Sequence, residues 1–150
     1  MDSLEKSTIL YCKFLENLTL NNLKTLNQFV DQDIFFTDPF HQTKGVNKYI
    51  AILKTMFKTF DQIDFETRKI FFNASNSTDF ASFNWTLKMR HRKSTKPVRI
   101  DGMTLVEVSQ QGLITRHEDY WDPSSSIYCI IPLLGSALDF VRRRIKNTSN

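Results

Sequence analysis

The amino-acid sequence predicts an α+β fold in which a curved, mostly antiparallel sheet wraps over helices. Up to Phe60, apolar residues recur mainly at helical spacing, with one short apolar run at Ile34–Asp38. From Ile63 to Trp121 the pattern changes to that of strands separated by turns. A last apolar stripe at helical spacing follows Pro123. Helices and strands that are segregated along the chain in this way are typical of an α+β fold.

Four segments have the apolar periodicity of amphipathic helices. The first extends from Leu4 to Leu18, and the second covers Leu23–Val30. The third, Val46–Phe60, is the clearest, and Gly45 supplies the turn before it. The fourth helix has a stripe made of Leu134, Leu138, Val141 and Ile145. We expect this stripe to dock on the protein, which would place Ile127–Leu133 across or near the mouth of a pocket.

The strands are predicted from alternation of apolar and polar residues between polar turns. Asn73–Asp79, Arg92–Pro97 and Ser109–Gly112 are the turns. The strands between them are Phe65–Phe72, Phe83–Met89, Val98–Val108 and Leu113–Trp121. Phe83 to Met89 alternates strictly, as a half-buried antiparallel strand should. Together with Ile34–Asp38, these segments predict one sheet.

Composition and length indicate one domain that spans residues 1–150, with 124–147 as a C-terminal helical extension. The net charge of +4 is a mild excess that does not by itself imply nucleic acid, and we predict no nucleic-acid partner. Cys12 and Cys129 lie in apolar segments and are expected to be reduced and buried. No signal peptide is evident, and Ile127–Leu138 is too short to span a bilayer. We therefore expect a cytoplasmic protein.

Ionisable groups sit at the ends of two apolar strands. Asp38 ends the first, where Pro39 stops the strand because it cannot donate a ladder hydrogen bond. In the last strand, period two puts His117, Asp119 and Trp121 on one face. If both strand ends line one cavity, it holds two carboxylates, an imidazole and an aromatic wall. Such a pocket suits acid/base work on an apolar small molecule, with no cofactor and no metal.

The order of elements and two motifs resemble the superfamily of nuclear transport factor 2, ketosteroid isomerase and SnoaL-like polyketide cyclases. The resemblance covers roughly Leu4 to Tyr128. Phe36–Gly45 contains an Asp-Pro pair, a short loop and a glycine, and a predicted helix follows it. Many SnoaL-like proteins have a similar passage. Gly112–Asp122 is similar to the Gly turn and His-x-Asp ending of the cyclase branch. The resemblance implies a cone-shaped sheet around the N-terminal helices.

The resemblance also implies roles for single residues. In the isomerase branch the Asp of the Asp-Pro pair is the general base, which implies Asp38, and a Tyr on the first helix is an oxyanion donor, which implies Tyr11. These isomerases also need a protonated Asp, at a position that Thr104 holds here. In the cyclase branch the Asp of His-x-Asp is the acid/base residue, which implies Asp119 with help from His117. The further ligand-binding candidates are His41, Trp85 and Trp121.

Each candidate also has a purely structural interpretation. Asp38 can cap a turn, because Asx turns are common at strand ends. His117 and Asp119 can be a hydrogen-bonded pair that stabilises the end of the sheet. Two function classes therefore stay open: a pocket protein with cyclase-like or isomerase-like acid/base chemistry, and a non-catalytic binding or interaction module of the same fold.

Two clusters of basic residues on the surface affect which partners we expect. Basic residues flank the hairpin between Lys88 and Arg99 and end the last helix at Arg142–Lys146. In the structural interpretation, the basic residues of the hairpin occupy the alternate strand positions that face solvent. Those at Arg142–Lys146 interact favourably with the dipole at the C-terminus of the helix. The less favoured alternative for Arg142–Lys146 is peripheral contact with anionic lipid. Relatives with this fold commonly pair through the outer sheet face, which implies a homodimer that must neutralise these charges.

Overall fold

The computed structural model describes residues 3–72, 80–128 and 134–148. The N-terminal part contains the helix α1 (Ser3–Glu16), the short 3-10 helix η1 (Leu23–Gln28) and the helix α2 (Val46–Thr59). The strands are β1 (Val30–Thr37), β2 (Gln42–Lys44), β3 (Phe60–Phe72), β4 (Phe80–His91), β5 (Pro97–Val108) and β6 (Ile114–Trp121). Two helices follow, α3 (Pro123–Ser126) and α4 (Leu134–Thr148).

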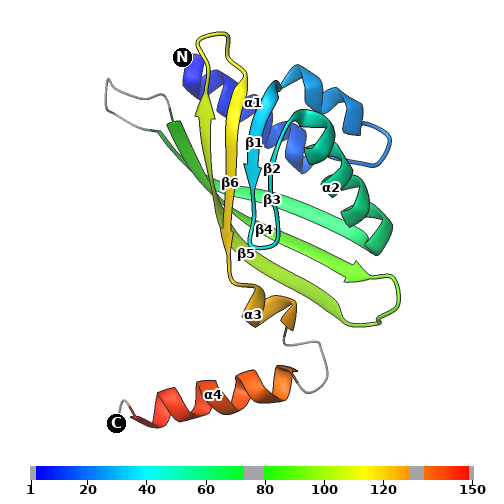
Figure 1. Ribbon diagram of the computed structural model, residues 1–150, viewed down its shortest axis with the longest axis vertical. Coiled ribbons are helices and arrows are strands. Elements are labelled where there is room, and N and C mark those ends of the chain that lie inside the picture. Colours follow the sequence, from blue (N-terminus) through cyan, green and yellow to red (C-terminus); the bar gives the residue numbers. More distant parts are fainter. Residues whose placement is uncertain (1–2, 73–79, 129–133, 149–150) are drawn as a thin grey trace.

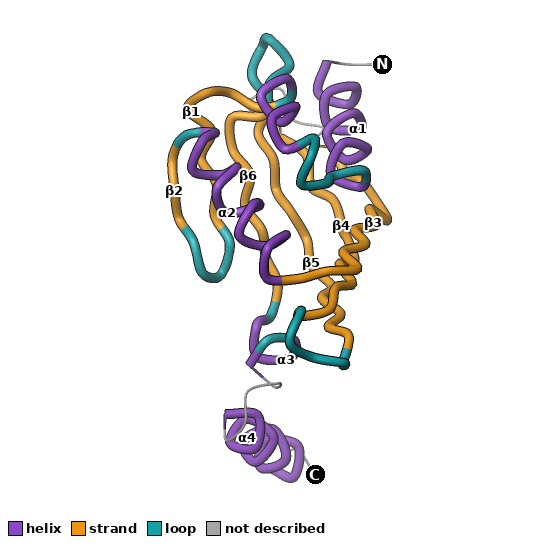
Figure 2. Tube along the Cα trace, turned by 90° about the vertical axis from the view of Figure 1, so that its right-hand side faces the viewer, coloured by secondary structure: helices purple, strands orange, loops and turns teal. Residues whose placement is uncertain are grey.

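The six strands form one curved sheet in the order β2-β1-β6-β5-β4-β3, and α1 and α2 lie on its concave side (Figures 1 and 2). All neighbouring strands are antiparallel except β1 and β6, which are parallel. The predicted α+β fold, with its mixed, mostly antiparallel sheet and an extra C-terminal helix, is confirmed. The parallel pair matters for the site because it puts Phe36 beside His117.

Burial explains why the sheet curves around the helices. Inward positions of β4 and β5, such as Phe83 and Val106, are fully buried, and both strands contact α1. On the helices, Tyr11 and Tyr49 are among the most buried side chains of the described residues. The buried core therefore lies between the helices and the concave side of the sheet.

Several element boundaries differ from the sequence-based prediction, and the first strand begins at Val30 rather than at Ile34. The second helix is shorter and of the 3-10 type, because the chain enters the sheet where Phe29 accepts a hydrogen bond from the Ile114 amide (2.9 Å). Val30 consequently pairs with Ile114 in the sheet and does not extend the helix. The strand β3 begins at Phe60, directly after α2, and the short strand β2 was not predicted.

The prediction that the last helix docks on the cone is wrong for the described residues. Figures 1 and 2 show α4 standing away from the sheet, and Leu134, Val141 and Ile145 of its stripe are exposed. The concave face, which would suit an apolar helix, is already covered by α1 and α2. Residues 129–133 of the expected lid, Cys129 and the predicted turn at 73–79 lie outside the described residues.

Among the helices of the described residues, none combines the length and the hydropathy needed to cross a lipid bilayer.

Candidate functional site

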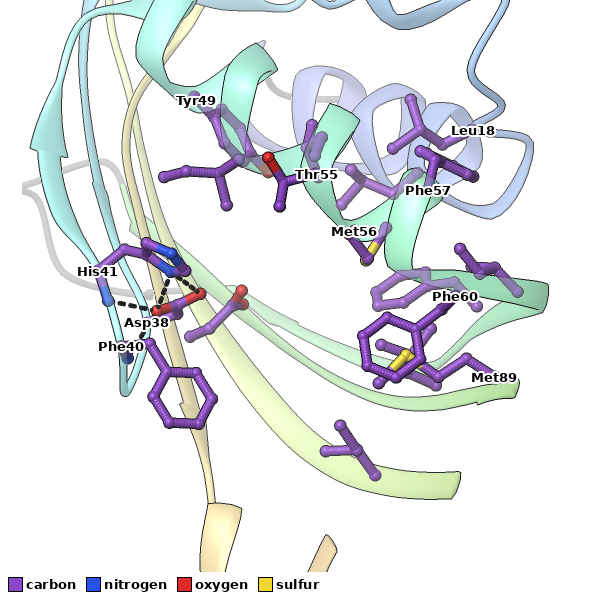
Figure 3. A pocket seen from close by; sticks show the side chains of 18 of the residues that line it. Leu18, Asp38, Phe40, His41, Tyr49, Thr55, Met56, Phe57, Phe60 and Met89 are labelled. Atoms are coloured by element: carbon purple, nitrogen blue, oxygen red, sulfur yellow. Dashed lines mark hydrogen bonds and ion pairs between the residues drawn. The ribbon is translucent and has the colours of Figure 1, made fainter. Parts of the chain in front are cut away.

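A cavity of about 580 Å³ lies between α2 and the concave face of the sheet (Figure 3). Most of its wall is apolar and aromatic, and this volume falls in the range that small-molecule sites occupy. In Figure 3, Asp38 and His41 lie on one side of the cavity, while Phe60 and Met89 lie on the other. The ionisable groups are therefore gathered at one side of an otherwise apolar space.

Asp38 lines this cavity from the tight loop between β1 and β2. Its Oδ1 atom accepts hydrogen bonds from the backbone amides of Phe40 (2.8 Å) and His41 (2.6 Å), which is the geometry of an Asx turn. The Nδ1 atom of His41 lies 2.9 Å from the same oxygen. Asp38 thus organises the turn, as the structural interpretation expects, and its carboxylate also faces the cavity.

His117 and Asp119 extend from β6 on the cavity side. The His117 side chain is only 4% exposed, and its Nε2 atom lies 2.9 Å from Oδ1 of Asp119. Trp121 lies on the same face, whereas Tyr120 points outward and donates a hydrogen bond to Glu118. The structure therefore places the alternate residues of this strand on the faces that period two predicted.

Thr104 and Trp85 support Asp119 from the neighbouring strands. Thr104 lies opposite Asp119 in the β5–β6 register, and its hydroxyl donates to Oδ1 of Asp119. The indole Nε1 of Trp85 donates to the Thr104 hydroxyl at 2.7 Å. Gly102 is opposite Trp85, and a Cβ atom there would overlap the indole ring. The missing side chain at Gly102 is what allows the indole to lie flat against the sheet.

Two tyrosines continue the network behind His117. The Tyr11 hydroxyl lies 2.8 Å from Nδ1 of His117 and 3.1 Å from the Tyr49 hydroxyl. Burial raises the pKa of Tyr11 well above its ordinary value and does the same for Tyr49, with the Asp119 charge adding to the rise for Tyr49. Both phenols are therefore neutral hydrogen-bonding groups at ordinary pH.

The direction of these hydrogen bonds follows from their chemistry. An ionised Asp119 only accepts, so Nε2 of His117 carries hydrogen and Nδ1 of the neutral ring accepts from Tyr11. The Tyr49 hydroxyl then donates to Tyr11 and can only accept from a ligand in the cavity. If His117 gains a proton, Nδ1 donates, both hydroxyls reverse, and Tyr49 can donate into the cavity. The protonation state of one imidazole thus sets what Tyr49 offers a ligand.

One oxygen of Asp119 remains available. Within the described residues, Oδ1 accepts the hydrogen bonds from Thr104 and His117, and Oδ2 accepts none. The Asp119 side chain is 19% exposed and lines the cavity. A carboxylate with one anchored oxygen and one oxygen open to the cavity can reach a ligand proton, as an acid/base group must.

Six of the eight candidates from the sequence line the cavity: Asp38, His41, Trp85, His117, Asp119 and Trp121. Tyr11 and Thr104 lie behind the wall and reach the cavity only through hydrogen bonds. The roles of all eight in binding or catalysis stay predictions. In the described part of the chain, no group of three or more His, Cys, Asp or Glu side chains is placed to hold a metal ion.

Tyr49 and Glu16 are cavity residues that were not among the site candidates. Tyr49 was assigned only to the apolar stripe of its helix, although its hydroxyl belongs to the network. Glu16 also lines the cavity, and its carboxylate accepts a hydrogen bond from the Thr67 amide (3.0 Å). A polar tip on an otherwise apolar helix face was the available signal for Tyr49.

Comparison with known proteins gives a family and a fold. A family model described as a SnoaL-like domain matches residues 12–117. No curated protein matches the sequence. A putative SnoaL-like polyketide cyclase from Jannaschia sp. CCS1 superposes with a TM-score of 0.69 at 10% identity, covering 82% of this chain and 88% of its own.

Two proteins from Mycobacterium tuberculosis are also similar in structure. An epoxide hydrolase of the LEH-like type has a TM-score of 0.61 at 16% identity and covers 80% of this chain and 79% of its own. A protein solved in complex with estradiol-17β-hemisuccinate has a TM-score of 0.65 at 14% identity, and the match covers 81% of this chain and 95% of that protein. At such identities the likeness establishes the fold and not the activity.

Proposed function

Because the chain belongs to the SnoaL-like domain family, we propose that it binds a small, largely apolar molecule in the cone cavity and transfers a proton on it through Asp119. The observation that carries this proposal is the convergence of two hydrogen bonds on one oxygen of Asp119, which leaves the other oxygen to the cavity. A carboxylate that only stabilised the sheet end would not need to face a cavity of about 580 Å³.

The residues around Asp119 have distinct positioning roles. His117 and Thr104 fix the orientation of the carboxylate, so that Oδ2 meets a ligand proton at a defined angle. Tyr49 is the neutral group that contacts a ligand oxygen, as acceptor or donor according to the charge on His117. The apolar wall excludes water and selects a ligand with rings or alkyl groups.

The complexes of two structural neighbours support small-molecule binding in this fold. One was solved with estradiol-17β-hemisuccinate, and another, from Catenulispora acidiphila, with trimethylamine. The first of these ligands is large and apolar with one carboxylate, which fits a cavity that is apolar with a polar side. Estradiol-17β-hemisuccinate is therefore a reasonable first probe for binding by this chain.

The decisive experiment separates binding from chemistry. Binding of estradiol-17β-hemisuccinate would be measured by quenching of tryptophan fluorescence, and exchange of the α-protons of cyclic ketones in deuterated water would be followed by NMR. We expect Asp119→Asn to slow exchange by roughly 10²–10⁴-fold and to keep most of the steroid affinity. The matched control is Asp64→Asn, which removes an exposed carboxylate from β3 and should change neither. Equal exchange by wild type and Asp119→Asn would refute the role of Asp119.

The second candidate is a binding protein without catalysis. Asp38 favours it, because its carboxylate is fully engaged in the turn with Phe40 and His41. In that case the wild-type protein binds the steroid and none of the ketones exchanges faster than in buffer. Asp119 would then only orient the ligand.

The homodimer and the cytoplasmic location are part of the proposal. Outer-face cations already have partners within the chain, since Arg90 pairs with Asp61 and Arg99 pairs with Asp101. This pairing removes the repulsion that an outer-face dimer would otherwise meet. Light scattering at low and moderate salt tests the dimer, and cell fractionation tests the location.

A further inference from the structure

The helix α4 presents an apolar face that the rest of the described chain does not cover. Leu134 is 41% exposed, Val141 51% and Ile145 63%, and Phe140 on the same helix is 64% exposed. Figures 1 and 2 show the helix at the end of the molecule opposite α1, and a hydrogen bond from Arg142 to Ser124 (3.2 Å) connects it to α3. An apolar face of this size on an exposed helix marks a contact surface.

The charges on the helix show what kind of surface it suits. Leu134–Thr148 contains three arginines and one lysine against a single acid, Asp139. The helix therefore carries +3 of the net charge of +4 of the whole chain. A partner that covers α4 must offer both apolar material and negative charge.

The arrangement of these residues around the helix is that of an interfacial helix. At 100° per residue, Leu134, Leu138, Val141 and Ile145 fall within an arc of about 60°. Arg142 and Arg144 flank this arc on its two sides, Arg143 lies on the opposite face, and Lys146 lies between Arg142 and Arg143. Long basic side chains at the edges of an apolar stripe can reach the phosphates of a bilayer while the stripe enters the acyl boundary.

We propose that α4 is the docking surface of this protein for an anionic phospholipid bilayer. A second copy of α4 is a poorer occupant, because two stripes packed together would bring the arginines that flank them against each other. The helix would lie in the plane of the interface and would not cross it. Binding would combine burial of the stripe with attraction of the cations to anionic lipid, so it would weaken as salt screens the charges.

The test is co-sedimentation of the full chain with vesicles. One set contains phosphatidylcholine alone, and the other contains about one-third phosphatidylserine. We expect binding to the anionic vesicles, little binding to the neutral ones, and release at high salt. Arg142→Gln with Arg144→Gln, which removes the two cations that flank the stripe, should weaken binding roughly 25-fold, at roughly fivefold for each cation removed. The matched control, Lys6→Gln with Lys13→Gln, removes two exposed cations from α1 at the far end and should bind like wild type.

A second variant tests the apolar stripe. Val141→Ala with Ile145→Ala keeps strong helix formers in α4 and removes apolar area, so it should lower vesicle binding while leaving the circular dichroism and the melting of the cone unchanged. Failure of the wild type to bind anionic vesicles would overturn the proposal, as would equal binding to both vesicle types. A dimer that dissociates in the alanine variant, without vesicle binding by the wild type, would show that α4 binds a second copy instead.

Discussion

Gly102→Ala is the substitution that tests most directly how the sheet supports the site. A Cβ atom at this position would lie 2.6 Å from Cη2 and 2.8 Å from Cε2 of Trp85, and closer still to Cζ2. Real Cβ atoms do not approach ring carbons so closely, so the indole or the strand must move. The indole packs against Phe65, with ring centroids 5.5 Å apart, and lines the cavity, so a shift into the cavity would take it away from Phe65 and Thr104.

The expected cost has two parts. Overpacking of a buried site costs about 1–3 kcal/mol. Displacement of the ring also breaks the hydrogen bond from Trp85 to Thr104, which adds about 1 kcal/mol. We therefore expect Gly102→Ala to lower the free energy of unfolding by about 2–4 kcal/mol. For a chain of this length, the melting temperature should fall by roughly 6–12 °C.

The assay combines urea unfolding with tryptophan fluorescence. A Trp121→Phe background leaves Trp85 as the only indole, because the sequence has two tryptophans. The emission of Trp85 should shift to longer wavelength as the ring becomes more exposed. Met103→Ala is the control, since it truncates the next residue of the same strand on the exposed outer face. If Gly102→Ala unfolds like the parent with unchanged emission, the close approach has no structural role and the reasoning is wrong.

Two further predictions concern buried titratable groups. Tyr11→Phe should destabilise the protein by about 2–3 kcal/mol, because it leaves the imidazole and a second hydroxyl without partners, whereas Tyr49→Phe should cost about 1 kcal/mol; urea unfolding that gives the reverse order would contradict the network. Burial raises the pKa of the Cys12 thiol from 9.0 to about 12. Above pH 9 the thiol ionises in the unfolded chain and stays protonated in the folded one, so stability should fall between pH 9 and about pH 12. The free energy of unfolding of Cys12→Ala should fall less between pH 9 and about pH 12 than that of the parent. In a Cys129→Ser background, the Cys12 thiol should react with a disulfide reagent only when the protein unfolds. Rapid labelling of the native protein would show that the thiol is exposed.

The sequence predicted those parts of the fold and site that depend on local periodicity. Alternation along β6 is a property of neighbouring residues, so it placed His117 and Asp119 on one face without knowledge of the other strands. The stripe of α2 was predicted for the same reason. Thr104 was placed near the site by counting from Gly112, but its pairing with Asp119 also depends on a register shift between Glu107 and Val108, without which it would pair with Glu118.

The parts that were missed depend on partners far away in the chain. The polar tip of Tyr49 was visible in the sequence, but its contact with the Tyr11 hydroxyl depends on the packing of α1, and nothing near residue 49 indicates that contact. The short second helix ends where Ile114, a strand residue far along the chain, pairs with Val30. The docking of α4 on the cone was inferred from its apolar stripe alone. Such a stripe indicates that the helix needs an apolar partner, but it does not indicate which surface that partner is.

The parallel pairing of β1 with β6 has a consequence for how the protein matures on the ribosome. The strand β6 lies between β1 and β5, and it is the last strand of the sheet to be synthesised. Until β6 inserts, the β1–β2 hairpin is not joined to the rest of the sheet. The cavity also lacks His117 and Asp119, which β6 carries. Such long-range closure is slow relative to local helix formation. A nascent chain that stops before Ile114 should therefore hold helices and a β3–β4–β5 meander but no ligand. Acquisition of binding would thus report the completion of folding rather than its beginning.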